Sequence, residues 1–251
     1  SEQAHQTQEL GLIYKKPRIK AELIVSNGIR TPTLFELFGD RGLFKGSEEL
    51  LPERAKTLSM GVTYNNQVAQ FNYLFNTSFY HQQSDNAIVA IFNSSGVGAY
   101  KNVSNAKLNG LELETKLTFS PDLNLSLQAN IIDSHTSSVI KSFDNKKLPS
   151  IYHQQYSVAV NYQFNAQWKI HLRSAIDRGL YFNQANIFAS TNGQAGKPSQ
   201  RRLTDVQLGY TTGVYNINVS MNNLFDQQYQ DLANRPAQGR SIQFKLSIQG
   251  I

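Results

Sequence analysis

The side chains that could carry catalytic chemistry form no familiar pattern in this sequence. There is no cysteine among the 251 residues, so the chain offers neither a thiol nucleophile nor a disulfide. Neither the HExxH metal motif nor a phosphate-binding GxxxxGK loop occurs. The histidines do not share the spacing of metal ligands; they are His5, His81, His135, His153 and His171. We therefore predict that the protein is not an enzyme and has no catalytic residue, metal site or cofactor.

Cationic and aromatic residues in the stretch SNGIRTPTLFELFGDRGLFKG (26–46) could bind a ligand. The cations would hold an anionic ligand, and the phenylalanine rings would pack on its apolar parts. The candidate contacts are Arg30, Phe35, Arg41, Phe44 and Lys45. In the competing structural interpretation, Pro32 removes a backbone donor and ends a strand. Leu34, Phe35 and Leu37 would then pack the loop onto neighbouring structure, and we favour this interpretation.

A second basic group lies in the segment QWKIHLRSAI (167–176). Lys169, His171 and Arg173 occupy alternate positions, so in a strand their side chains would point to the same face. Such a stripe could attract anions, or it could pair with acidic groups of another segment. We favour the pairing.

Regular alternation of apolar and polar residues predicts that β-strands position these groups. In LELETKLTFSPDLNLSLQANII (111–132), the odd positions are mostly apolar and the even positions polar on both sides of the turn SPD. The same pattern recurs along the chain, and no segment of comparable length has a helical period. The predicted strands are 8–14, 18–26, 57–64, 70–79, 111–120, 123–132, 155–164, 167–176, 205–210, 214–222 and 241–248.

Short and long connections alternate between these strands. The short ones each follow an aromatic residue: Tyr14, Tyr64, Phe119, Phe164 and Tyr210. The long ones are polar and cover approximately 27–53, 81–104, 134–149, 178–200 and 226–239. Aromatic girdles, short periplasmic turns and long extracellular loops are typical of outer-membrane barrels. The pattern predicts an all-β, antiparallel transmembrane β-barrel, whose apolar face meets lipid and whose polar face lines a wet, wide interior.

Composition is consistent with this fold and argues against other classes. No run approaches 18 apolar residues, so no transmembrane helix is predicted. The formal net charge of +6 is spread along the chain, which argues against a nucleic-acid partner. The first residues, SEQAHQTQEL, do not have the pattern of a secretion signal. Either a signal has been removed or the chain begins partway through a larger protein.

Five stretches together resemble the barrel of TonB-dependent outer-membrane receptors. They are SNGIRTPTLFELFGDRG (26–42), ELLPERAKTLSMGV (49–62), NVSNAKLNGLELE (102–114), NNLFDQQYQDL (222–232) and GRSIQFKLSI (239–248). They are similar to the family's R-x-P-(T/S)-L-x-E-L run, PE strand entry, GxE strand, NLFD strand end and GR strand opening. The matching positions, expected to be structural, are Pro32, Glu36, Pro52, Glu53, Gly110, Glu112, Asn223, Phe225, Asp226, Gly239 and Arg240.

The resemblance implies a function in transport across the outer membrane of a Gram-negative bacterium. Such receptors are 22-stranded up-and-down barrels closed by an N-terminal plug. The implied cargo is a scarce, large nutrient such as a ferric siderophore, another metal chelate or cobalamin. The implied partners are outer-membrane lipid and lipopolysaccharide, the remaining barrel half with its plug, and the TonB complex, which acts through that missing part.

The sequence also departs from the family pattern. It contains no plug-like region, no TonB box at its start and only about 11 strands, and it ends on Ile251 rather than on an aromatic residue. We therefore expect residues 1–251 to be the C-terminal part of the receptor barrel. The alternatives are a truncated fragment that does not transport, half of a passive porin, and a soluble β-sandwich that binds a ligand.

Overall fold

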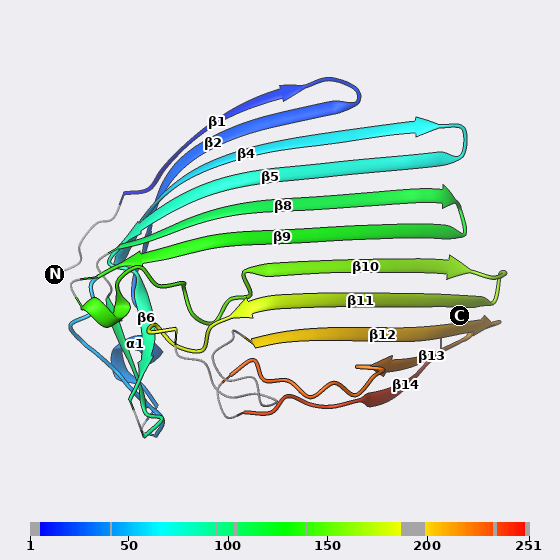
Figure 1. Ribbon diagram of the computed structural model, residues 1–251. Coiled ribbons are helices and arrows are strands. Elements are labelled where there is room, and N and C mark those ends of the chain that lie inside the picture. The colour runs from blue at the N-terminus through cyan, green and yellow to red at the C-terminus, as the bar shows by residue number, and fades with distance from the viewer. Residues whose placement is uncertain are drawn as a thin grey trace.

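One large antiparallel sheet dominates the structure. The computed structural model describes residues 6–40, 42–93, 95–102, 105–138, 140–186, 199–232 and 235–248. Eleven strands follow one another in chain order across this sheet, which curves as an open wall (Figure 1). They are β1 (Gln8–Lys15), β2 (Ile19–Arg30), β4 (Glu53–Val68), β5 (Phe71–Asp85), β8 (Asn105–Ser120), β9 (Leu123–Ser137), β10 (Gln154–Gln163), β11 (Trp168–Leu180), β12 (Ser199–Thr212), β13 (Tyr215–Asn222) and β14 (Ser241–Ile248). The predicted number of strands and their antiparallel order are confirmed.

Strand register keeps the apolar and polar residues on opposite faces of this wall. Leu113 stands opposite Thr77 and Ala129, whereas its neighbour Glu112 stands opposite Ser78 and Asn130. Residues directly opposite each other share a face. The register therefore assembles one apolar face and one polar face.

The apolar face is not covered by another layer of the described chain. Large hydrophobic side chains on it are exposed, among them Leu23, Phe79, Leu111, Leu127 and Leu172. Only nine hydrophobic residues of the described part are buried: Leu50, Ala87, Ile88, Val89, Ala106, Tyr152, Ala175, Leu180 and Phe182. A soluble sandwich would bury this face against a second sheet. The described residues form no second sheet packed on this face, so their fold is not the β-sandwich of the alternative prediction, and the face is suited to lipid.

All five short turns join the strands at one end, and the long connections join them at the opposite end (Figure 1). One turn differs from the prediction, which placed it directly after Tyr64. The structure continues β4 to Val68, because Asn65, Asn66 and Gln67 extend the ladder with β5. The chain reverses at residues 69–70, where Ala69 adopts a positive φ of 53°.

Aromatic side chains gather near the strand ends that the short turns connect, and they contact one another. Tyr64 and Tyr73 lie with ring centroids 5.9 Å apart, and Phe71 and Phe119 with centroids 5.3 Å apart. Trp168 contacts Tyr210 at 4.5 Å between the centroids. These contacts join rings from neighbouring strands, as expected of a girdle at a lipid–water interface.

The long connections contain more regular structure than the sequence predicted. They hold a short helix, α1 (Leu34–Phe38), a 3-10 turn, η1 (Lys141–Phe143), and a small sheet of β3 (Phe44–Lys45), β7 (Gly98–Asn102) and β6 (Ile88–Phe92). Several wall strands also extend into the predicted loops, as β5 does to Asp85 and β9 to Ser137. Among the described residues, no helix is both long and apolar enough to cross a membrane.

The two outer strands of the wall, β1 and β14, each pair on one side only. β1 pairs with β2, and β14 pairs with β13. Every residue of β1 is exposed. Within the described residues, the second edge of each strand therefore has no partner strand.

Candidate ligand-facing surface

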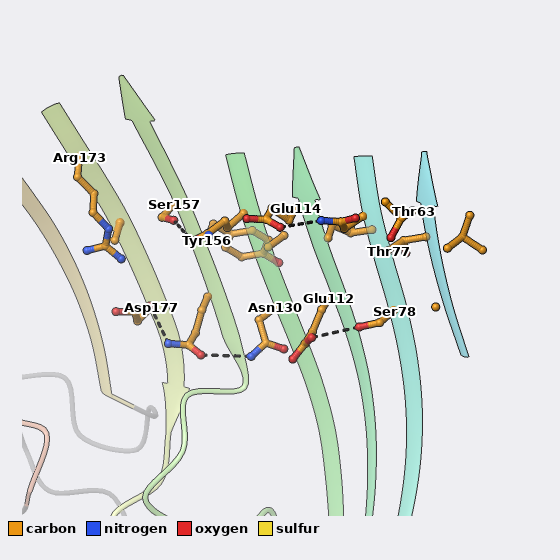
Figure 2. A pocket seen from close by; sticks show the side chains of 18 of the residues that line it. Thr63, Thr77, Ser78, Glu112, Glu114, Asn130, Tyr156, Ser157, Arg173 and Asp177 are labelled. Carbon is orange, nitrogen blue, oxygen red and sulfur yellow. Dashed lines mark hydrogen bonds between the residues drawn. The ribbon is translucent and has the colours of Figure 1, made fainter. Parts of the chain in front are cut away.

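The polar face of the wall forms a hollow lined by charged and amide side chains. Figure 2 shows Glu112, Glu114, Asn130, Arg173 and Asp177 together at this hollow, carried by neighbouring strands. Each strand contributes alternate residues, so the polar positions of the sequence pattern become the lining. The continuous polar surface that the alternation predicted is therefore confirmed.

One row of directly opposed residues crosses this face from β2 to β12. In strand order it consists of Glu22, Gly61, Ser78, Glu112, Asn130, Gln155, Asp177 and Arg201. None of its side chains is apolar. The row therefore presents hydrogen-bonding groups across most of the wall. They are available to a ligand or to a domain that fills the interior of the barrel.

Hydrogen bonds link neighbouring members of the polar face. Ser78 donates to Glu112 at 3.1 Å, and Asn76 donates to Glu114 at 2.8 Å. Gln155 donates to Asp177 at 3.3 Å and accepts from Asn130 at 3.4 Å. These bonds orient the side chains along the wall, and the cross-strand pairing of polar residues supports the register.

The predicted basic stripe lies on this same face. Arg173 lines the hollow, and Lys169 and His171 line a second depression nearer the short turns. His171 Nδ1 lies 2.7 Å from Asn161 Oδ1, and Arg173 stands opposite Asp205 in the register. The stripe thus has polar neighbours within the wall, while its proposed pairing with another segment stays a prediction.

Gly110 of the GxE motif makes room for an aromatic ring on the polar face. It stands opposite Tyr80, and a Cβ atom at Gly110 would fall on the Tyr80 ring. A glycine at this position therefore allows the ring to approach the strand backbone closely. Glu112, two residues further along β8, points to the same face and belongs to the row described above.

Three motif residues form an ion-pair cluster where β2 ends. The Arg30 guanidinium donates to Glu53 at 2.7 and 2.9 Å, and to Glu36 at 2.9 and 3.0 Å. Glu53 also accepts the backbone N–H of Ile88 at 2.5 Å. The cluster ties together β2, α1, β4 and the small sheet. Arg30 ends β2 and is held by two carboxylates, so the structure gives it a positioning role, and its predicted ligand contact is untested.

Glu36 also caps the helix that follows Pro32. Thr33 is the N-cap of α1, and its hydroxyl and backbone N–H both bond with Glu36 in a capping box. Burial of the Glu36 carboxyl raises its pKa, but the hydrogen bonds from Arg30 and Thr33 outweigh burial and hold the pKa below its ordinary value. Glu36 is therefore charged at neutral pH and can pair with Arg30.

The other predicted ligand contacts occupy different surroundings. Phe35 and Phe44 pack together with Tyr100, with Phe44 stacked on Tyr100 at 5.7 Å between ring centroids. Lys45 is exposed beside them, and Arg41 lies outside the described residues. The structure thus brings Phe35, Phe44 and Lys45 into one region. Leu34 is exposed, so the predicted packing of this residue onto neighbouring structure is wrong.

The NLFD and GR motifs meet at the connection between β13 and β14. Asn223 bonds through its side chain with the backbone of Gln227 at 2.9 and 3.0 Å, and Asp226 accepts the Arg240 N–H at 2.7 Å. Asn223 and Asp226 both adopt positive φ values. A Cβ atom at Gly239 would crowd the Asp226 carboxylate. Phe225 is exposed. The NLFD and GR motifs therefore determine the geometry of the turn that follows β13 and of the entry into β14.

Sequence reasoning missed a cluster centred on Arg201. Its guanidinium pairs with Asp177 at 2.7 Å and Asp231 at 2.5 Å, and it lies near the rings of Tyr152 and Tyr229. Tyr152 donates to Asp231 at 2.7 Å. Burial and this hydrogen bond raise the pKa of Tyr152. The members come from distant segments, so no local spacing could have revealed them. The cluster fixes part of a long connection to the rim of the polar face.

An antiparallel wall with one exposed apolar face and one polar face has the architecture of part of a transmembrane β-barrel. The family model "TonB dependent receptor-like, beta-barrel" matches residues 9–224. The chain belongs to this TonB-dependent receptor family, whose barrels lie in the outer membrane. The predicted family is confirmed.

Solved structures agree on the fold. The chain is similar to the copper transporter OprC, with 16% identity, a TM-score of 0.73, and coverage of 96% of this chain and 38% of that one. The siderophore receptor PiuA from Acinetobacter baumannii gives 17% identity, a TM-score of 0.73, and coverage of 96% and 35%. The FrpB iron transporter from Neisseria meningitidis gives 17% identity, a TM-score of 0.69, and coverage of 96% and 39%. The chain thus spans somewhat over a third of the length of these proteins.

Proposed function

We propose that this chain forms the C-terminal part of the barrel of an outer-membrane transporter that imports a large, scarce nutrient, driven by the TonB complex. The observation that carries the proposal is the polar row from Glu22 to Arg201 on a wall whose opposite face is apolar. Such a wall, completed by further strands, encloses a hydrated passage. We infer that this surface binds the cargo selectively during transport and does not catalyse a reaction.

The cargo that best fits this surface is a metal chelate. Relatives with the same fold are named as copper, iron and siderophore transporters or receptors. The region of Phe35, Phe44, Tyr100 and Lys45 offers stacked rings beside an exposed cation. The aromatic rings can pack on the apolar parts of a chelate, and the lysine can pair with its negative charge. We propose Phe35, Phe44 and Lys45, with Arg41, as the first contacts of such a cargo.

Uptake requires the rest of the receptor, because two strand edges of the wall are open. An unpaired backbone group in hydrocarbon costs several kcal/mol, so the wall alone should not form a stable pore. We expect cells that lack the receptor to show no energy-dependent uptake when they express this chain alone. Uptake should return when the remaining strands and the plug are supplied as a second polypeptide. The probes are radioiron as a ferric catecholate, radiocopper, and radiolabelled cobalamin.

The uptake result separates the alternatives. Accumulation that continues after a protonophore collapses the proton gradient would indicate passive diffusion, as in a porin. No accumulation of any probe with both polypeptides present in the outer membrane would favour a fragment that does not transport. Energy-dependent accumulation by this chain alone would contradict the requirement for the rest of the receptor.

The orientation of the wall gives a separate prediction. Short turns face the periplasm and long connections face the outside in such barrels. A cysteine at Lys141, in the β9–β10 connection, should react with an impermeant thiol reagent on intact cells. A cysteine at Asp122, in the β8–β9 turn, should react only after lysis. The sequence has no native cysteine to interfere, and labelling of the Asp122 variant on intact cells would reverse the orientation.

A further inference from the structure

A buried histidine joins β9, β11 and the connection between β9 and β10. His153 is the last residue of this connection, directly before β10, and only 6% of its surface is exposed. Its Nδ1 atom lies 2.7 Å from the carbonyl oxygen of Gly179, and its Nε2 atom lies 2.7 Å from the hydroxyl oxygen of Ser134. Ser134 is fully buried. We call His153, Ser134 and Gly179 the histidine clasp.

A bulge in β11 brings the Gly179 carbonyl to the histidine ring. The register between β11 and β12 shifts between Arg178 and Leu180, so Gly179 is the additional residue. Gly179 adopts a positive φ of 77°, a conformation that favours glycine. A Cβ atom at this position would lie 3.1 Å from the Cβ atom of His153. Glycine therefore permits both the bulge and the close approach of His153.

The hydrogen-bond partners of the ring require a neutral histidine. A carbonyl oxygen only accepts, so Nδ1 must carry a proton and donate it to Gly179. The Ser134 oxygen already accepts the backbone N–H of Leu148 at 2.9 Å. In the neutral ring, Nε2 can accept the hydroxyl proton of Ser134, and every donor then has an acceptor. The clasp therefore fits the neutral form of His153.

Protonation of Nε2 would remove the acceptor of the Ser134 hydroxyl. Within the described residues, the Ser134 side chain bonds only with His153 and Leu148, so its proton would have no other acceptor. A buried charged ring and an unpaired buried hydroxyl both cost free energy. Burial accordingly holds the pKa of His153 below its ordinary value. Acid therefore acts against the closed clasp.

Charged and titratable residues surround the clasp on several sides. Those that line the same hollow as His153 are Asp133 on β9, Lys147 in the connection, Arg178 on β11 and Tyr181 after β11. The charge of Lys147 opposes protonation of His153, whereas Asp133, which is paired with Lys147, favours it. His135 is exposed and lies 3.4 Å from Lys147 Nζ. It is the competing source of any pH dependence in this region.

Leu148 connects the clasp to the small sheet. Its backbone N–H is held by Ser134, and its side chain packs against the buried cluster of Ala87, Val89 and Ala106. Val89 belongs to β6, which pairs with β7. Release of Leu148 would therefore remove a packing partner of the small sheet.

We propose that the histidine clasp is a pH-sensitive switch, which holds the β9–β10 connection in place at neutral pH and releases it in acid. Well above the ordinary histidine pKa of about 6.5, His153 is neutral whether it is held or released, and the clasp keeps its hydrogen bonds. Below that pH, a released His153 binds a proton that the held ring resists, so acid favours release. The switch goes beyond the proposed transport function, because it acts on the connection whatever the cargo.

The test is hydrogen–deuterium exchange of residues 145–150 in the assembled receptor, consisting of this chain with its remaining strands and plug, in lipid nanodiscs. Exchange rates are corrected for the intrinsic effect of pH on amide exchange. The opening equilibrium constant for the Leu148 N–H should then rise about five- to tenfold from pH 7.5 to pH 5.5. About tenfold is the limit that a released histidine of ordinary pKa allows over this interval.

His153→Gln should abolish the rise, because glutamine offers an amide donor and a carbonyl acceptor but does not titrate. His135→Gln is the matched control: it removes an exposed histidine of the same region and should keep the rise. A wild-type change below about twofold would overturn the inference. An unchanged rise in His153→Gln, or its loss in His135→Gln, would also overturn it.

A second measurement needs no substitution in the clasp. An NMR titration of the ring carbons of labelled histidine, in the wild-type receptor, follows His153 and His135 separately. We expect His153 to remain neutral at a pH where His135 is already protonated, and its protonation to coincide with faster exchange of Leu148. Protonation of His153 without any change in the exchange of Leu148 would overturn the inference.

Discussion

Leu127→Arg is expected to destabilise the assembled barrel by about 2–4 kcal/mol, because it places a cation in hydrocarbon near the middle of the membrane. Leu127 is exposed on the apolar face, where it stands opposite Thr115 and Val158. The measurement is the free energy of unfolding in lipid vesicles, followed by tryptophan fluorescence and by the gel shift of the folded barrel. Trp168 is the only tryptophan of this chain.

The neighbouring residue supplies the control for that substitution. Gln128 points to the polar face, opposite Glu114 and Ser157. Gln128→Arg adds the same charge one residue away, but in a hydrated position beside a carboxylate. We expect it to change the unfolding free energy by less than about 1 kcal/mol. Equal losses for Leu127→Arg and Gln128→Arg would contradict the assignment of the two faces.

Gly110→Ala should cost about 1–3 kcal/mol, because the new methyl group would occupy the space of the Tyr80 ring. The ring lies over the strand backbone, and its displacement would disturb the neighbouring polar side chains. The same unfolding measurement in lipid vesicles reports this loss.

Two further variants identify the cause of the Gly110 effect. Gly28→Ala changes a glycine of β2 whose added Cβ would meet nothing within 4 Å, and we expect little change. Tyr80→Ala removes the ring, so adding Gly110→Ala to that variant should cost much less than it does in the wild type. An unchanged cost in the absence of Tyr80 would show that the ring is not the reason for the glycine.

Periodicity predicted the strands well because lipid and water impose opposite demands on alternate residues. Each strand has one face toward lipid and one toward water. The alternation of neighbouring residues in a segment such as 111–132 therefore reveals the strand and its two faces. The turn after Tyr64 was misplaced because an aromatic residue marks the interface and not the strand end. Residues 65–68 continue the ladder beyond the girdle, and β-strand extension there depends on the partner strand rather than on local pattern.

The candidate site was less predictable because its geometry depends on distant pairings. Arg30 looked like a free cation in sequence, yet its partners are Glu36 and the more distant Glu53. The motif resemblance marked both carboxylates as structural without showing that they meet. Arg201 and Asp231 gave no signal at all, since cross-strand register and loop folding bring them together.

The order of the strands has a consequence for how the wall can be closed. Successive strands point in opposite directions, so the first and the eleventh, β1 and β14, point the same way. Bending the sheet until these two met would create a parallel seam, and two copies inserted in the same direction and placed edge to edge would create two such seams. An antiparallel closure therefore needs an intervening set with an odd number of strands, whose two outer members both run opposite to β1. The parity of this wall therefore excludes an all-antiparallel ring built only from copies of itself that all insert in the same direction across the membrane.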